Sequence, residues 1–420
     1  MGRRSGGTNV LSLTFFPAAG YVSGAMLALP AQGGLGQDSQ AMSDPREFEI
    51  AGIEARVFRV PIANPVRTSF GIMHSRPAVL VRAVDAQGTE GWGEVWCNFP
   101  SVGAEHRARL IRETVAPLLK GRRFHSPDQV WRSASQALEV LAIQSGEPGP
   151  IAQCLAGVDV ALWDLAARAQ GQPLYRYLGA GAAAQRLPVY ASGLNPDRPE
   201  DLAAAKKAEG HRAFKLKVGF GRERDLANLA ALRKTLGDAA ALMVDANQGW
   251  DLETALCMSR AIAPFRPLWL EEPLRADAPV EAWQQLARTS PIPLAAGENL
   301  RGDDFSAAVG TGWVKVLQPD LGKWGGFSGC VAVARGALAA RTRFCPHWLG
   351  GGIGLIASFH LLAAVGGDGL VEVDSNPNPL RELMAVPFPT LADGHMDMPQ
   401  GPGLGVVPDL AALRAFEITA

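Results

Sequence analysis

Seven ionisable residues recur at nearly equal spacing along the C-terminal part of this 420-residue chain. Each lies at or near the end of a short apolar run: Lys217, Asp245, Glu271, Glu298, Asp320, His347 and Glu372. Their spacing accommodates one strand, one helix and two loops. A parallel (β/α) barrel collects the C-terminal ends of its strands on one face, so we expect the seven side chains to converge on one site.

Three of these residues are acids at the ends of consecutive predicted strands. Asp245, Glu271 and Glu298 lie in the segments VDAN, LEEP and GEN. Converging carboxylates repel one another strongly unless a cation neutralises them. Ligation by oxygen alone suits Mg²⁺, which leaves positions open for substrate oxygens. One such acid would more often be a cap or half of a salt bridge, but three at matched positions favour a metal site.

Two lysines lie on one face of the preceding predicted strand, because side chains two residues apart point the same way. Lys215 and Lys217 in FKLKVG are flanked by apolar residues, so their face is the barrel interior, where an unpaired lysine is costly. Lys217 is nearer the mouth, and we predict a general base with a lowered pKa. For Lys215 the pattern leaves open an ion pair with the barrel acids or a role in substrate binding.

The sixth and seventh strand ends carry an acid and a histidine. Asp320 in LQPDLGKWGG and His347 in RFCPHW come from neighbouring strands, so Asp320 is placed to fix the imidazole tautomer and raise its basicity. Glu372, in LVEVD, ends the eighth strand. It either donates a proton to a developing oxyanion, if its carboxyl is neutral, or forms a structural salt bridge.

Strand and helix patterns alternate from Leu187 onward, which predicts a parallel sheet closed into a barrel. The predicted strands are Leu187–Ser192, Ala213–Val218, Ala241–Asp245, Leu268–Glu271, Pro293–Glu298, Trp313–Asp320, Thr342–His347 and Leu370–Asp374. Helical patterns between them include Asp225–Leu236, Leu252–Ile262, Pro279–Thr289, Asp303–Gly310 and Gly326–Ala340.

The pattern before Leu187 belongs to an α+β domain. Strands are predicted at Ile53–Val60, Pro77–Asp85 and Gly88–Trp96, the last two as an antiparallel hairpin, and helices follow, of which Ile151–Ala169 bridges to the barrel. We therefore predict four segments: an N-terminal extension at 1–47, the α+β domain with its bridging helix at 48–180, the barrel at 181–386, and a C-terminal segment at 387–420 that returns to the α+β domain.

The N-terminal extension has two interpretations. Arg3 and Arg4 precede an apolar stretch, as in a secretory or twin-arginine signal, but the interpretation we favour is a reading frame that begins too far upstream, with Met42 as the natural start. Pro17, Gly20 and other breakers interrupt the stretch, which argues against a membrane span.

The composition favours a small molecule as the partner and a reducing compartment. The net charge is −1 and no long basic or acidic block occurs, so neither nucleic acid nor a membrane is an expected partner. Five widely spread cysteines without a CxxC pair argue against disulfides and zinc sites, which suggests the cytoplasm. We expect a small carboxylic acid as substrate and a homo-oligomer of open order.

The motifs together resemble the enolase superfamily and, within it, the mandelate racemase subgroup. Eight segments in order carry the resemblance, from about Ile53 to the C-terminus: GWGE (Gly91–Glu94), GVDVALWDLAARAQGQPL (Gly157–Leu174), Lys215/Lys217, VDANQ (Val244–Gln248), EEP (Glu271–Pro273), GEN (Gly297–Asn299), PDLGKWGG (Pro319–Gly326) and PH (Pro346–His347). The resemblance implies the α/β fold class, as a (β/α)7β TIM-like barrel with an N-terminal α+β capping domain.

The resemblance also implies a role for each site residue. By position, Asp245, Glu271 and Glu298 are Mg²⁺ ligands, and Lys217 is one acid/base, assisted by Lys215. The Asp320/His347 pair is the opposing acid/base, and Glu372 stabilises the enolate. The muconate-lactonizing subgroup uses a lysine on the sixth strand instead; Lys323 is present here, but Asp320 and His347 together favour the racemase type.

The expected reaction is Mg²⁺-dependent abstraction of a proton α to a carboxylate, through an enediolate that charge already in place must stabilise. We favour dehydration of a sugar acid or another hydroxy acid. Racemisation or epimerisation of a 2-hydroxy acid on the same site is the alternative.

The predicted substrate contacts indicate two different kinds of substrate. In the family, loops of the capping domain cover the barrel mouth, here about 64–73 and 95–102. Arg67 and Asn98 suit hydroxyls or an anionic group, Trp348 suits an apolar wall, and Asn247 in VDANQ is a further candidate. A polyol would favour the polar residues, and an aryl or alkyl hydroxy acid the apolar wall.

Two other classes of protein share parts of this pattern. A barrel that binds a ligand without turnover would lack the two bases present here. A phosphate-binding barrel enzyme would carry a glycine-rich anion loop after the seventh or eighth strand, and Leu349–Gly354 (LGGGIG) keeps that alternative open.

Overall fold

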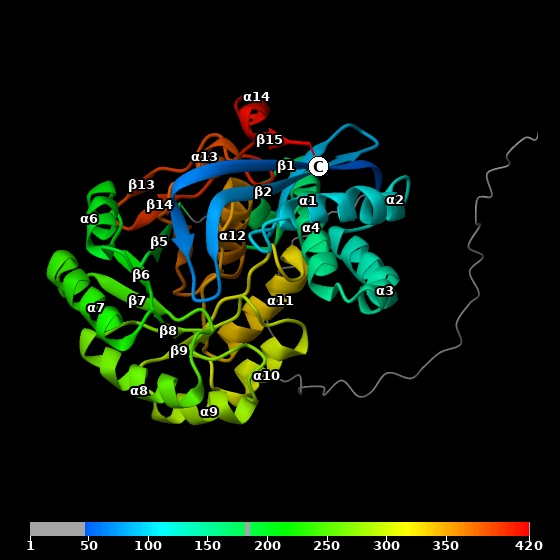
Figure 1. Ribbon diagram of the computed structural model, residues 1–420. Helices are drawn as coiled ribbons and strands as arrows, with labels where there is room; N and C mark the ends of the chain where they lie inside the picture. The colour runs from blue at the N-terminus through cyan, green and yellow to red at the C-terminus, as the bar shows by residue number, and fades with distance from the viewer. Residues whose placement is uncertain (1–46, 181–184, 420) are drawn as a thin grey trace, which may run out of the picture. The chain divides into compact units, whose positions relative to one another are not determined.

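The computed structural model describes residues 47–180 and 185–419 (Figure 1). The two interpretations of the N-terminal extension concern residues that lie outside the described ones. The rest comprises an α+β sheet with its helices and a barrel (Figure 1).

The capping domain is built on an antiparallel sheet with the strand order β15-β1-β2-β3. Its strands are β1 (Phe48–Arg67), β2 (Ile72–Asp85) and β3 (Glu90–Val95), with β4 (Arg123–Phe124) also paired to β1. The predicted hairpin between β2 and β3 is confirmed. β1 and β2 are longer than predicted, because they continue as a two-stranded ribbon past a register shift between Pro61 and Val66, into residues 64–73 that were expected to form a loop.

Helices cover one face of this sheet. They are α1 (Gly103–Leu110), a π-helical turn (Ile111–Val115), α2 (Ala116–Leu119), α3 (Pro127–Ser145) and α4 (Pro148–Ala169), followed by the short α5 (Leu174–Tyr177). The ends of α3 carry the expected signals: the Ser126 hydroxyl accepts from the Gln129 amide, and Gly146 closes the helix in the left-handed conformation.

α4 is the bridge between capping domain and barrel. Among the described residues it is the one helix long and apolar enough to cross a membrane, but 83% of its most apolar window is buried in the fold, as in a core helix. β3 approaches it through glycines. A Cβ atom on Gly93 would lie 2.0 Å from the Gly157 carbonyl oxygen, and one on Gly91 would lie 2.1 Å from that of Ala161.

Eight strands form the barrel, as the sequence predicted. They are β5 (Arg186–Leu194), β6 (Ala213–Lys217), β7 (Ala241–Asp245), β8 (Leu270–Glu271), β9 (Leu294–Ala296), β10 (Val316–Leu317), β11 (Arg343–Phe344) and β12 (Val371–Asp374). Neighbours from β5 to β11 pair in parallel, and β12 pairs in parallel with β5. This circular order brings the carboxyl ends of the strands to one face.

Helices surround the strands (Figure 1). They are α6 (Pro199–Glu209), α7 (Arg222–Leu236), α8 (Leu252–Ile262) with a 3₁₀ turn (Ala263–Phe265), α9 (Val280–Thr289), α10 (Asp303–Thr311), α11 (Gly326–Ala339) and α12 (Gly352–Val365). α12 is buried along almost its whole length.

The C-terminal segment pairs with both parts of the molecule. After α13 (Pro379–Leu383), the hairpin β13 (Leu391–Ala392) and β14 (His395–Asp397) adds to β5 of the barrel, whereas β15 (Glu417–Ile418) pairs with β1. α14 (Leu410–Leu413) and a 3₁₀ turn (Arg414–Phe416) lie between them. The sequence predicted a return to the capping domain alone; the barrel also takes part of this segment because β14 pairs with residues 186–188 of β5, which precede the residues that pair with β12 and β6.

An apolar layer fills the barrel below the site. Tyr190, Met243, Trp269 and Cys345 are buried together, and each precedes by two residues a polar side chain of the next layer. Strand side chains alternate between two faces, so this arrangement places the polar residues in one ring above an apolar floor.

The contact between β3 and α4 gives a stability prediction. Gly93→Ala places a methyl group against the backbone of α4, so we expect the free energy of unfolding to fall by roughly 1–3 kcal/mol in urea denaturation. Gly52→Ala is the control, since a Cβ atom there has no neighbour within 4 Å and should change stability by less than about 0.5 kcal/mol. Equal effects of the two substitutions would contradict the close approach.

Candidate active site

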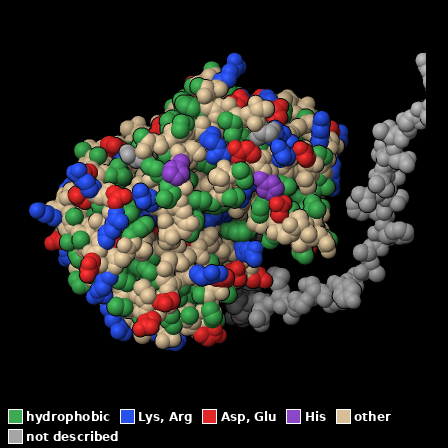
Figure 2. All heavy atoms as spheres, viewed as in Figure 1, with side chains coloured by type: hydrophobic (Ala, Val, Ile, Leu, Met, Phe, Trp, Pro, Cys, Tyr) green, Lys and Arg blue, Asp and Glu red, His purple; other side chains and the backbone are tan. Residues whose placement is uncertain are grey.

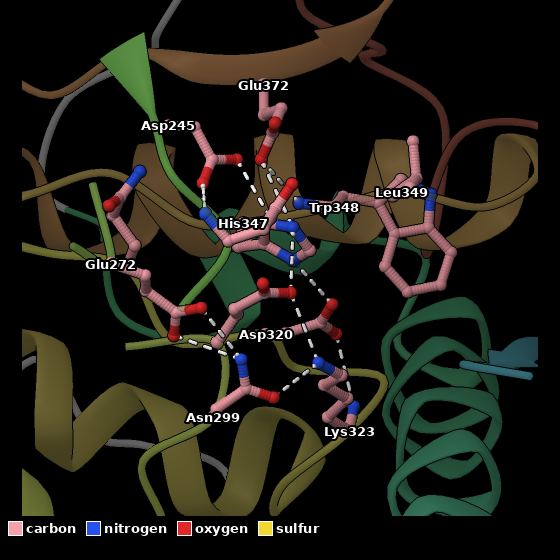
Figure 3. Close-up of polar contacts among 12 residues, drawn as sticks. Asp245, Glu272, Asn299, Asp320, Lys323, His347, Trp348, Leu349 and Glu372 are labelled. Atoms are coloured by element: carbon pink, nitrogen blue, oxygen red, sulfur yellow. Dashed lines mark hydrogen bonds and ion pairs between the residues drawn. The ribbon is translucent and has the colours of Figure 1, made fainter. Parts of the chain in front are cut away.

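The predicted site residues lie at the carboxyl ends of the barrel strands (Figure 3). Lys217, Asp245 and Glu271 are the last residues of β6, β7 and β8, and Glu372 lies within β12. The other three follow their strands by two or three residues: Glu298 after β9, Asp320 after β10 and His347 after β11. Gly297 has a φ of +156°, and a Cβ atom there would lie 2.4 Å from the Gln318 backbone, so only glycine permits this approach before Glu298.

Both lysines are buried and paired with the acids. Lys215 Nζ lies 2.5 Å from Glu271 Oε1 and 2.8 Å from Glu372 Oε1, and Lys217 Nζ lies 2.7 Å from Asp245 Oδ2. Burial lowers the pKa of Lys217, but the charge of Asp245 outweighs it and raises the pKa above its usual value. Lys215 acts in the predicted direction and lowers this pKa, so Asp245 is the group that opposes the predicted lowering.

His347 is held between acids (Figure 3). Its Nδ1 lies 2.7 Å from Asp320 Oδ2, and its Nε2 lies 3.1 Å from Glu298 Oε2 and 3.6 Å from Glu372 Oε2. Burial lowers the pKa of His347, but Glu298, Glu372 and Asp320 outweigh it and raise the pKa to about 9. Asp320 is fixed in turn, since its Oδ1 accepts from the Gly322 amide at 2.8 Å.

Glu372 forms the ion pair that was one of its two alternatives. Besides Lys215, it accepts a hydrogen bond from the Ser192 hydroxyl and one from the Trp348 amide at 3.2 Å. Burial raises its pKa, but Lys215 and His347 outweigh burial and lower the pKa to about 2. The carboxyl is therefore ionised here, and a proton-donating role is not supported by this geometry.

The remaining carboxylates repel one another. Burial raises the pKa of Glu271 to about 7, with Asp245 and Glu372 adding to the effect against Lys215. Burial and the charge of Glu298 hold the pKa of Glu272 well above its usual value. Burial also raises the pKa of Glu298, but His347 and Lys323 outweigh it and leave that pKa far below normal. Negative charge is thus concentrated around β7, β8 and β9.

The three predicted metal ligands, Asp245, Glu271 and Glu298, do not point at one common position. Within residues 47–180 and 185–419, no three His, Cys, Asp or Glu side chains are arranged to hold a metal ion. Asp245 and Glu271 instead contact the lysines, and Glu298 contacts Lys323 and His347. The donor set nevertheless fits a hard divalent cation, because buried carboxylates on three neighbouring strands offer oxygen ligands and carry uncompensated charge.

Several contacts of the site carboxylates were not predicted from the sequence. Lys323 Nζ bonds Glu298 Oε2 at 3.1 Å and Asn299 Oδ1 at 3.0 Å, and lies 4.4 Å from the centre of the Trp96 ring of the capping domain. Glu271 accepts from Gln318 Nε2 at 2.7 Å and from Trp269 Nε1 at 3.1 Å. Gln318 and Trp269 each lie two residues before a predicted site residue, so strand alternation was the signal that could have found them.

Two predicted substrate contacts are used by the protein itself. Asn98 Nδ2 donates to the Leu349 carbonyl at 2.6 Å, and Trp348 Nε1 donates to the Gly351 carbonyl at 2.8 Å. Both side chains are buried. The Trp348 ring is wedged against glycines, since Cβ atoms on Gly322 and Gly354 would lie 2.4 Å and 2.0 Å from it. These residues shape the wall of the site rather than offer free polar groups.

The other two predicted contacts lie where the capping ribbon meets the barrel. Arg67 is half exposed, and its Nε lies 3.6 Å from Asp197 Oδ2 at the edge of a 490 Å³ pocket. Asn247 has a φ of +44°; its Nδ2 donates to Asp245 Oδ2 at 3.1 Å, and its carbonyl accepts from Ser69 Oγ at 2.6 Å. Asn247 therefore joins the ribbon to a predicted metal ligand.

The glycine-rich segment LGGGIG is already occupied by an internal anion. Glu94 of β3 accepts hydrogen bonds from the Gly351 amide at 2.5 Å and the Gly354 amide at 3.0 Å. A phosphate would need the same amides, because the first turn of a helix binds anions through its free N–H groups. The alternative of a phosphate-binding barrel enzyme is therefore wrong for this loop.

Comparisons with known proteins agree with this architecture. Residues 52–179 match the mandelate racemase/muconate lactonizing enzyme N-terminal domain, and residues 198–412 match the enolase C-terminal domain-like family. The chain belongs to the mandelate racemase/muconate lactonizing enzyme family. The resemblance seen in the sequence is thus confirmed, and with it the (β/α)7β barrel with its capping domain.

Several family members are similar along most of the chain. A mandelate racemase/muconate lactonizing enzyme from Bordetella bronchiseptica is 53% identical, with a TM-score of 0.83 over 88% of this chain and 99% of that one. The D-galactarolactone cycloisomerase of Agrobacterium fabrum is 30% identical over 88% of this chain and 99% of its own length. A D-galactonate dehydratase from Ralstonia pickettii is 32% identical over 66% and 72%. A racemase from Streptomyces coelicolor, solved with bound magnesium, is 29% identical over 88% of this chain and all of that one, with a TM-score of 0.79.

The contact between Asp320 and His347 predicts how the pKa of His347 responds to substitution. Asp320→Asn removes a charge that favours the imidazolium form, so we expect the pKa of His347 to fall from about 9 toward neutrality. NMR titration of the histidine rings in chelator would measure it. The reference within the same spectra is His360, whose pKa burial lowers to about 4 and which lies in a different part of the fold. An unchanged or raised His347 pKa would contradict the account.

Proposed function

We propose that this enzyme removes the proton α to the carboxylate of a hydroxylated acid, with Mg²⁺ held by Asp245, Glu271 and Glu298. The observation that carries the proposal is the orientation of His347: its Nδ1 faces Asp320, and its Nε2 faces the predicted metal-site carboxylates. An imidazole oriented in this way can exchange a proton with a molecule bound beside those carboxylates.

The charge balance supports the cation. Six carboxylates meet at the strand ends: Asp245, Glu271, Glu272, Glu298, Asp320 and Glu372. Against them stand Lys215, Lys217, Lys323 and an imidazolium at His347. A divalent cation offsets the excess of negative charge. When bound, Mg²⁺ supplies a Lewis acid for the substrate carboxylate, and magnesium is present in the racemase relative from Streptomyces coelicolor.

The protein groups divide the remaining work. Lys217, at the end of the second barrel strand, takes or returns the α-proton from one side. His347, after the seventh strand, serves the other side, with Asp320 holding its tautomer. Lys215, between Glu271 and Glu372, donates to the charge that develops on the substrate carboxylate.

Elimination is the outcome we favour. When His347 protonates a leaving group at the β-carbon, the product is an enol that becomes a 2-keto acid. Loss of a hydroxyl gives dehydration, the activity of the D-galactonate dehydratase relative. In a lactone, cleavage of the bond between the β-carbon and the ring oxygen opens the ring and keeps that oxygen as part of a new carboxylate, which is an isomerisation. The relative from Agrobacterium fabrum, matched over 99% of its length, is a D-galactarolactone cycloisomerase. Return of the proton to the opposite face gives racemisation or epimerisation.

The proposal extends to the substrate class, the compartment and the oligomeric state. A small carboxylic acid suits a buried, charged site, and acidic and basic side chains are interspersed on the face in Figure 2 rather than gathered into one field. All five cysteines are free, which agrees with a reducing compartment such as the cytoplasm. A homo-oligomer stays a prediction.

A screen of acid sugars and their lactones with Mg²⁺ tests the function. We expect a keto acid, detected with semicarbazide, to form with Mg²⁺ and not with chelator. Mass spectrometry then separates loss of water from opening of a lactone, which keeps the mass. Glu271→Gln should weaken Mg²⁺ binding in calorimetry by at least about tenfold, since it removes one charged ligand. A turned-over acid that gains solvent deuterium at the α-carbon without forming a keto acid would make the enzyme a racemase or epimerase.

A further inference from the structure

Two buried acids outside the reaction site reach from the capping side of the molecule into the barrel. Glu94 lies on β3 of the capping sheet, and Asp159 lies on the bridging helix α4. Neither contacts a side chain of opposite charge in the described part of the chain; each instead accepts hydrogen bonds from the first turn of a barrel helix.

Glu94 caps α12. Its two carboxylate oxygens accept from the Gly351 and Gly354 amides, which a helix leaves without partners of its own. The helix has no cap from its own side chains, because its N-cap residue is Gly351. A Cβ atom at Gly351 would lie 2.6 Å from Glu94 Oε1, so the glycine allows the carboxylate to approach.

Asp159 caps α11 in the same way. Its Oδ2 accepts from the Ser328 amide at 3.1 Å, and its Oδ1 accepts from the Ser328 hydroxyl at 2.5 Å. The N-cap residue is again a glycine, Gly325. Gly326 has a φ of +57°, and a Cβ atom there would lie 2.2 Å from Asp159 Oδ2. In both caps, a carboxylate from another element binds the glycine-rich first turn of a barrel helix.

Helices α11 and α12 directly follow the strands β10 and β11, which lead to Asp320 and His347. α11 begins shortly after Asp320, and α12 begins shortly after His347. Trp348 connects these loops: its ring packs against Gly322 of one loop and Gly354 of the other, and its amide donates to Glu372. Gly354 lies in the first turn of α12, and Gly322 in the loop that leads to α11, so a shift of either helix start would reach the loop that carries His347.

We propose that Glu94 and Asp159 are positioning residues that set the Asp320–His347 geometry from the capping side, by filling the N-terminal turns of α12 and α11. The capping domain then supplies more than a cover for the barrel mouth. A charged cap at a helix start stabilises that turn, through hydrogen bonds and the helix dipole. The consequence for catalysis rests on the function proposed above, whereas the consequence for the dyad does not.

The first test monitors the hydrogen bond between His347 and Asp320 by NMR and needs no substrate. The proton shared by His347 Nδ1 and Asp320 should give a far-downfield proton NMR resonance, assigned by its loss in His347→Asn. In Glu94→Gln and in Asp159→Asn, measured at a pH above 7 where the native carboxylates are mainly ionised, we expect this resonance to shift or broaden. Glu90→Gln is the matched control, because Glu90 lies on the same strand β3 but pairs with Arg82 in a partly exposed ion pair. An unchanged resonance in both variants would overturn the proposal.

The second test reads turnover. We expect kcat to fall about tenfold or more in each variant, with KM within about twofold, since a loss of about 1.4 kcal/mol in transition-state stabilisation is a factor of ten. Formate should restore part of the activity of Glu94→Ala by occupying the vacated amides of Gly351 and Gly354, and it should do nothing for Glu90→Gln. A loss of kcat that follows only the loss of folded protein, with no rescue, would contradict positioning. If no substrate is found, the resonance alone decides.

Discussion

The structure depends on one constraint, the packing of more buried carboxylates than cations at the mouth of a barrel. Bringing such groups out of water is costly unless each finds a partner. Lys215 joins Glu271 to Glu372, Lys217 holds Asp245, and Lys323 with His347 holds Glu298. The raised pKa of Glu271, about 7, reflects the negative charge that these pairs leave uncompensated. The apolar layer below, with Tyr190 and Trp269, closes the site from beneath and keeps these charges at the strand ends.

Much of this could be predicted from the sequence. The spacing of seven ionisable residues predicted the last seven barrel strands in order, because each strand–helix unit has a similar length and the carboxyl ends of parallel strands must share a face. The first strand followed from the apolar pattern that starts at Leu187. The pairing of His347 with Asp320 also followed, since neighbouring strand ends are adjacent in space. Element ends were less accurate: β8, β10 and β11 are only two residues long, because the chain leaves the ladder early to carry Glu272, Asp320 and His347 into loops.

Other features could not be predicted because they depend on contacts between segments far apart in the chain. Burial lowers the pKa of Lys217 and the charge of Asp245 raises it on balance, and alternation along a strand does not reveal that contact. Asn98 was expected to bind hydroxyls or an anionic group of the substrate, but its amide donates to the loop after β11, whereas Trp348 keeps its ring for the predicted apolar wall. Glu94 and Asp159 lie in recognised motifs but had no predicted role. Three of their four partners are backbone amides, which residue types do not reveal, and the fourth is the Ser328 hydroxyl.

Exchange of the α-proton with solvent deuterium, followed for each enantiomer of a substrate, tests the central claim that Lys217 and His347 serve opposite faces. The account predicts that Lys217→Ala loses exchange for one enantiomer and keeps it for the other, and that His347→Asn shows the reverse pattern. Equal loss for both enantiomers in both variants, with Mg²⁺ binding and folding intact, would contradict a site with two bases.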